Sequence, residues 1–197
     1  MHTMRLRSTA LSLALCGLSA VGCAADTSES DLPHHGSTDA LSESVEALAC
    51  KKPIPASLAV PEGTHLAFSL LGRGTQNYAC KQAADGSFAW TFIEPEAILY
   101  GPLGWRLGHH FAGPTWEAND GSTVVGSKLA GETVDATAIP WLLLQAKSHT
   151  GQGFMAKITY VQRLDTVGGL APTSGCDAAH ADTTADVAYT AKYSFYR

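Results

Sequence analysis

Histidine, tryptophan and glutamate lie close together in the segment from Gly108 to Ser122. His110 and Glu117 flank a Gly-Pro turn, so two adjacent strands could bring the imidazole and the carboxylate together. Such a pair can bind a metal or act as an acid and base, and Trp116 can stack on a sugar ring. Structural roles also suit these residues: Trp116 in a core, Glu117 accepting hydrogen bonds from turn N–H groups, and His110 at the end of a strand.

A second pair of polar residues, Asp177 and His180, follows Cys176. Residues three apart face the same side of a helical turn, so these three side chains could complete a metal site with His110. Alternatively, Asp177 is the N-cap of the short turn that contains His180. Arg163 could bind an anion, but an arginine on a strand more often lies on a solvated face or forms an ion pair.

The sequence contains no motif typical of a dinucleotide-binding site or of a catalytic serine nucleophile. A nicotinamide site requires Gly-x-Gly-x-x-Gly between a strand and a helix, and Gly72 and Gly74 lack a third glycine in register. A Gly-x-Ser-x-Gly elbow is also absent. We therefore expect no cofactor.

Residues 1–22 have the pattern of a secretory signal peptide, with positive charges followed by an apolar segment at 11–21. That segment is too short to span a bilayer comfortably. The Gly-Cys pair at its end resembles a bacterial lipobox, which predicts lipidation of Cys23. Ordinary cleavage after Ala25 is the alternative. Either reading predicts a secreted or cell-envelope protein.

Residues 23–49 form an acidic segment with six carboxylates and no lysine or arginine. Its few apolar residues cannot offset the entropy of ordering, so we predict a disordered tether. The whole chain has a net charge of −5 (13 basic, 18 acidic); removing the two leader arginines and the six tether acids leaves 11 − 12 = −1 for residues 50–197. This near-neutral domain does not suit nucleic-acid binding or docking to anionic lipid, so contact with a membrane is expected only through a lipid anchor.

Apolar side chains in residues 50–197 alternate with a period of two, which is typical of half-buried strands. Turn signals such as Asp85-Gly86 and Asn119-Asp120-Gly121 separate these runs. The pattern predicts a single all-β domain, an antiparallel β-sandwich or an open β-barrel. The clearest strand has five residues on one face: Val187, Tyr189, Ala191, Tyr193 and Phe195.

Two segments have less certain patterns. Residues 139–144 form a continuous apolar run, which we interpret as a central strand covered on both faces, with a buried helix as the alternative. Residues 94–97 could begin a helical turn.

Three cysteines remain once the leader and Cys23 are set aside: Cys50, Cys80 and Cys176. In an oxidising compartment two of them should pair. We favour Cys80–Cys176 because both lie inside the patterned domain, and Cys50–Cys176 is the rival pairing.

Seven motifs occur in a fixed order along the domain: Gly74 to Cys80, Trp90 to Phe92, His110 to Glu117, Ile139 to Leu144, Gln162 to Leu164, Gly175 to Asp177 and Tyr193 to Tyr196. With these motifs, the chain resembles the secreted domain of unknown function 3455 family over residues 53–196. This resemblance implies a single secreted domain without a settled biochemical activity.

The sequence favours an exported, lipid-anchored binding or structural module at the cell surface, with a carbohydrate or cell-wall polymer as ligand. The oligomeric state stays open. The alternative is a metal-dependent enzyme, a hydrolase, that uses His110, Glu117, Asp177 and His180. The second hypothesis requires these four side chains to converge in one pocket.

Overall fold

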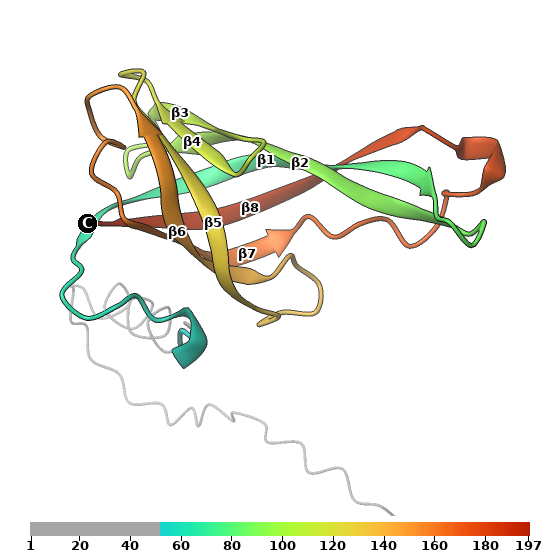
Figure 1. Cartoon of the computed structure of the whole chain (residues 1–197), viewed down its shortest axis with the longest axis horizontal. Helices are drawn as coiled ribbons and strands as arrows, with labels where there is room; N and C mark the ends of the chain where they lie inside the picture. The colour runs from blue at the N-terminus through green and yellow to red at the C-terminus, as the bar shows by residue number, and fades with distance from the viewer. Residues whose placement is uncertain (1–51) are drawn as a thin grey trace, which may run out of the picture. The chain divides into compact units, whose positions relative to one another are not determined.

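The computed structural model describes residues 52–197, which form eight antiparallel strands (Figure 1). Each strand pairs with its neighbours in sequence, and β8 also pairs with β1, so the sheet closes into an up-and-down barrel. The predicted all-β, antiparallel fold is therefore confirmed, as a closed barrel rather than a sandwich or an open barrel. The strands are β1 (Leu66–Gln82), β2 (Phe88–Tyr100), β3 (Arg106–Phe111), β4 (Thr115–Ala118), β5 (Thr123–Glu132), β6 (Trp141–Thr150), β7 (Tyr160–Gly168) and β8 (Thr184–Tyr196).

Two short 3-10 helices, η1 (Ala56–Leu58) and η2 (Ala178–His180), accompany the barrel. The predicted signal peptide (1–22), the tether (23–49), Cys23 and Cys50 lie outside the described residues. Within residues 52–197, no helix is long and apolar enough to cross a membrane.

The barrel interior is built by the alternation along β8. Tyr189, Tyr193 and Phe195 are buried on the face that the sequence predicted. Gly72 of β1 leaves space for one of these rings, because a Cβ there would lie 2.5 Å from Cε2 of Tyr193. Gly126 of β5 lies similarly close to the Trp116 ring, with a Cβ position 3.0 Å from it. These two glycines therefore leave room for the large aromatic rings that fill the barrel interior.

The apolar run at 139–144 enters β6 and is covered on both sides, as predicted. Trp141 and Leu143 pack against Leu58 of η1, whereas Leu144 belongs to the same cluster as Trp116 inside the barrel. Two opposite faces are thus buried, which explains why this strand shows no alternation in hydrophobicity.

The helical turn predicted at residues 94–97 is wrong, because these residues lie within β2. Pro95 faces Gln76 of β1, and a register shift occurs beside it, between Asn77 and Tyr78. A bulge tolerates a proline that cannot donate to the ladder. The long-range pairing with β1 therefore decides the conformation of this segment.

The longest strands, β1, β2 and β8, continue beyond the barrel as a ribbon, seen at the right of Figure 1. A disulfide between Cys80 and Cys176 joins the β7–β8 connection to β1, with the two Cα atoms 5.3 Å apart. Trp90 of β2 donates a hydrogen bond from Nε1 to the carbonyl of Ser174. The predicted Cys80–Cys176 pairing is confirmed, and a disulfide is compatible with an extracellular protein.

Candidate functional site

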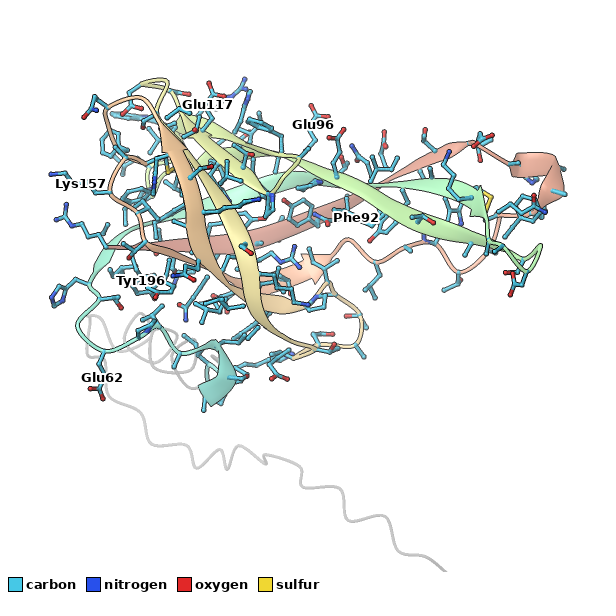
Figure 2. All side chains as sticks on the ribbon, viewed as in Figure 1. Glu62, Phe92, Glu96, Glu117, Lys157 and Tyr196 are labelled. Carbon is cyan, nitrogen blue, oxygen red and sulfur yellow. A yellow bond between two sulfur atoms is a disulfide. The ribbon has the colours of Figure 1, made fainter. Side chains whose placement is uncertain are left out.

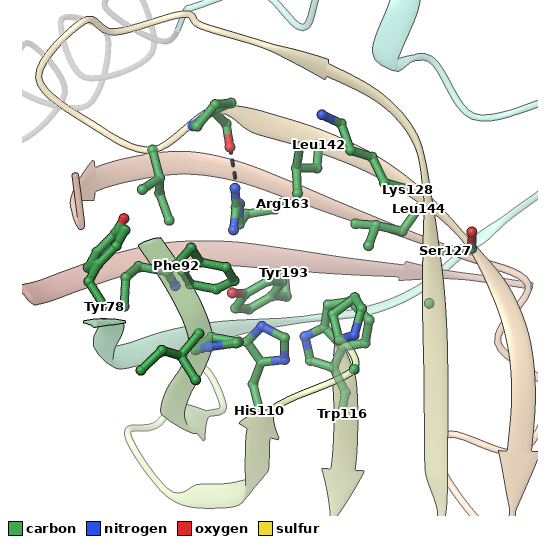
Figure 3. Close-up of a pocket in the computed structure, with 18 residues that line it drawn as sticks. Tyr78, Phe92, His110, Trp116, Ser127, Lys128, Leu142, Leu144, Arg163 and Tyr193 are labelled. Atoms are coloured by element: carbon green, nitrogen blue, oxygen red, sulfur yellow. Dashed lines mark hydrogen bonds between the residues drawn. The ribbon is translucent and has the colours of Figure 1, made fainter. Parts of the chain in front are cut away.

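A cavity of about 550 Å³ opens at the barrel end that carries the β3–β4 turn and the β5–β6 connection. Its walls are largely apolar, with Phe92 and Ile93 of β2 at 48% and 51% exposure and Leu142 and Leu144 of β6 opposite them (Figure 3). Polar side chains point into the same space. A concave apolar pocket with a few converging polar groups is typical of a small-molecule site.

His110 of β3 and Trp116 of β4 form the floor of this cavity. The two residues face each other directly across the β3–β4 hairpin, and their rings stack with centroids 4.6 Å apart and an interplanar angle of 7°. Both are almost fully buried, at 2% and 1% exposure. The hairpin therefore fixes the two rings as one unit, and the predicted core role of Trp116 agrees with its burial.

The protonation of His110 follows from its surroundings. Its Nδ1 lies 2.8 Å from the backbone oxygen of Thr115, and a carbonyl only accepts, so Nδ1 carries the proton and Nε2 does not. Burial lowers the pKa of His110 from 6.5 to about 3. The ring is consequently neutral at physiological pH and adds no charge to the cavity.

Nε1 of Trp116, a buried donor in the cavity wall, lacks a hydrogen-bond partner among the described residues. Nε2 of Gln76 is buried as well, and the Gln76 amide interacts with the Tyr189 hydroxyl. Leaving a buried donor unpaired costs about 1–3 kcal/mol. Tyr193 is satisfied instead, because its hydroxyl lies 3.0 Å from that of Tyr189. Burial raises the pKa of Tyr193 well above its ordinary value, so its hydroxyl stays protonated. The cavity wall therefore contains one buried N–H group, that of Trp116, that no described acceptor uses.

Arg163 of β7 brings a positive charge to the same cavity (Figure 3). Its Nε donates to the backbone oxygen of Pro140 at 3.1 Å, and the Tyr193 hydroxyl also interacts with the guanidinium. Burial lowers the pKa of Arg163 below its ordinary value, but an arginine remains charged. Among residues 52–197, the ion pairs are Lys52–Asp135, Lys81–Asp182 and His180–Asp177, so no described carboxylate neutralises Arg163.

The sequence model of a family described as protein of unknown function (DUF3455) matches residues 61–103 and 104–197. The chain belongs to this family. No curated protein and no solved structure matches the chain. The match spans all eight strands of the barrel, and it confirms the resemblance inferred from the ordered motifs.

Glu117 does not enter the cavity of this DUF3455 barrel. It follows Trp116 on β4 and therefore points to the opposite face of the strand, and Figure 2 shows it at the outer edge of the barrel. Its neighbours across the sheet are His109 and Thr123. The hairpin thus separates Glu117 from His110, because their positions have opposite parity.

Asp177 and His180 also lie outside the cavity, in η2 beside the disulfide. Oδ1 of Asp177 accepts hydrogen bonds from the backbone N–H of Ala179 and of His180, and it lies 2.7 Å from Nδ1 of His180. Both side chains are exposed. The N-cap role predicted for Asp177 is confirmed.

The four residues predicted to act together therefore do not converge, since His110 is the only one of them that lines the cavity. In the part of the chain that the structure describes, no group of three or more His, Cys, Asp or Glu side chains is placed to hold a metal ion. The donor set predicted for a metal-dependent hydrolase is thus not assembled.

Sequence reasoning left Gln76, Lys128 and Tyr193 out of the candidate site, and it favoured a solvated or ion-paired role for Arg163 over anion binding. One signal was available in the sequence. Tyr189 and Tyr193 recur on the buried face of β8, and buried tyrosines usually need polar partners. Their presence indicated a barrel interior that is polar in part.

Proposed function

We propose that this DUF3455 domain is a binding module that takes a small organic ligand into the cavity of its barrel. The observation that carries the proposal is the cavity of about 550 Å³, whose wall includes Trp116 with its buried N–H group, unpaired among the described residues. Small-molecule sites have volumes of roughly 300–1,000 Å³, and an eight-stranded barrel is wide enough to hold one small ligand.

Binding accounts for the cavity better than catalysis does. A general base must reach the proton that it removes, and the nearest candidate, His110, is held against Thr115 and stacked on Trp116. Its low pKa also makes it a weak base. The carboxylates predicted to assist it, Glu117 and Asp177, lie elsewhere.

A small ligand suits the site better than the polymer predicted from the sequence. A polymer needs exposed aromatic faces, whereas Trp116 is 1% exposed and its ring is stacked on His110. Trp105 is 69% exposed, but it lies on the β2–β3 connection, at the other end of the barrel. The cavity itself admits only a compact molecule.

The proposal includes export and a lipid anchor. The signal-peptide pattern of residues 1–22 and the Gly-Cys pair at Cys23 support it. An acidic tether over residues 23–49 would then hold the barrel away from a membrane surface. Such a module would bind its ligand in the cell envelope.

Titration with two related dyes tests the binding function. N-phenylnaphthylamine is uncharged, and anilinonaphthalene sulfonate is the same fluorophore with an added sulfonate. Leu142→Trp should fill the cavity, while Leu103→Trp adds the same side chain at a site that is 77% exposed on the β2–β3 connection. We expect saturable fluorescence for the wild type and for Leu103→Trp, and a loss for Leu142→Trp.

The binding proposal fails if neither dye binds saturably to the wild type. It also fails if Leu142→Trp and Leu103→Trp bind both dyes alike, because the dyes would then occupy another surface.

A further inference from the structure

We infer that the ligand of the cavity is a small organic acid whose anionic group is held by Arg163. This inference rests on the proposed binding function and names the ligand class. Three features of the cavity support it: its positive charge, an unpaired hydrogen-bond donor in its wall, and the position of its apolar side chains.

The charge of the cavity is positive. Arg163 lies in its wall and Lys128 lies exposed on β5 at the same cavity, whereas the described residues that line it include no aspartate or glutamate. Two cations without a counterion favour an anionic ligand. A partly buried cation gains most from such a ligand, because screening by solvent is weakest there.

The guanidinium has donors left for a ligand. An arginine has five N–H donors in a planar fork, and here Nε is used by the backbone oxygen of Pro140 while the Tyr193 hydroxyl accounts for one more interaction. The remaining N–H groups suit an anion with two oxygens, which an arginine can bind through parallel hydrogen bonds.

An unpaired donor in the cavity wall has the same preference. Nε1 of Trp116 is a donor only, and it is buried and unpaired among the described residues. An anionic group accepts hydrogen bonds and cannot donate them, so it complements this N–H group. A hydrogen bond to a charged acceptor is also stronger than one to a neutral alcohol or amine.

The apolar walls place the rest of the ligand. Phe92, Leu142 and Leu144 border the same space as Arg163 (Figure 3), and Phe92 packs edge-on against Tyr78 with ring centroids 5.7 Å apart. These walls suit an aromatic or alicyclic body. The ligand class is therefore an amphiphilic acid with one compact hydrophobic group.

The two dyes introduced above test this inference, because they differ only in the sulfonate. The wild type should bind anilinonaphthalene sulfonate about tenfold to a hundredfold more tightly than N-phenylnaphthylamine, the range typical of a hydrogen-bonded charge. Arg163→Met should abolish this preference while retaining N-phenylnaphthylamine binding, which also shows that the variant is folded. Arg73→Met is the matched control, because Arg73 is exposed on β1 and lies over the Tyr100 ring instead.

Equal affinity of the wild type for the two dyes would overturn the inference while leaving the binding function intact. An undiminished preference in Arg163→Met would overturn it as well. If Arg163→Met binds neither dye, its circular dichroism spectrum is compared with that of the wild type. A native spectrum would then contradict the inference. If the spectrum shows that the variant is unfolded, the affinities for the two dyes are compared in Arg163→Lys instead. This variant should keep part of the preference for anilinonaphthalene sulfonate. Equal affinity of Arg163→Lys for the two dyes would overturn the inference.

Discussion

His110→Phe should remove a large pH dependence of the stability of the barrel. An unfolded histidine has a pKa of about 6.5, whereas burial lowers the pKa of His110 in the folded protein to about 3. Between these values the unfolded state binds a proton that the folded state does not, so stability falls as the pH falls. The linkage relation gives a loss of about 3 kcal/mol between about pH 7.5 and about pH 4.5.

The measurement is urea unfolding of the wild type and of His110→Phe at both pH values. The wild type should lose about 3 kcal/mol more of its free energy of unfolding than the variant, which keeps an aromatic ring on Trp116 but has no proton to bind. His65→Gln is the control, since His65 is exposed, and it should behave as the wild type. The pKa of the Asp120 carboxyl is also lowered, by hydrogen bonds from Ser122 and the amide of Phe154. Its stabilising effect is lost only as the pH falls below about 4, so the interval isolates His110.

Equal losses in the wild type and in His110→Phe would refute this reasoning. So would a nuclear magnetic resonance titration in which the folded His110 ring binds a proton near its ordinary pKa. Either result would mean that the His110 ring is in contact with water, contrary to its 2% exposure in the structure.

Two further substitutions test the frame that holds the cavity. Replacing Cys80 and Cys176 together by serine removes a link across a sequence separation of 96 residues, and the free energy of unfolding measured in urea should fall by about 4–5 kcal/mol in the chain-entropy model; an unchanged midpoint would contradict this. Gly72→Ala should cost about 1–3 kcal/mol, because the new Cβ meets the Tyr193 ring. The cost should shrink in a Tyr193→Leu background, and two simply additive losses would exclude the clash.

The strands could be predicted from sequence because their signal is local. The alternation along residues 187–195 depends only on which side chains avoid water, and the structure buries Tyr189, Tyr193 and Phe195 accordingly. Closure of the barrel could not be predicted in this way. It depends on the pairing of β1 with β8, two strands at opposite ends of the domain, and no neighbouring residues encode that contact. The helical turn expected at residues 94–97 was overridden by another pairing, that of β2 with β1.

The same distinction between local signals and long-range pairing applies to the candidate site. The sequence predicted that His110 and Glu117 could meet across the turn, but the short hairpin instead places His110 opposite Trp116. Glu117 directly follows Trp116, so the alternation along β4 places its side chain on the outer face of the barrel, away from His110. Arg163 gained its importance only from closure, because its strand has an interior side only once the sheet forms a ring.

The cavity lowers the stability of the barrel. Packed apolar side chains would avoid an arginine without a carboxylate partner among residues 52–197 and an unpaired donor at Trp116, and burying such groups costs free energy. A ligand that supplies acceptors recovers part of that cost, and at a hundredfold excess over its Kd it stabilises the folded state by about 2.7 kcal/mol. Local departures from good packing concentrate where a protein functions. The combination of a charged group, an unpaired donor and empty volume in one place therefore indicates a site completed by its ligand rather than a core packed imperfectly.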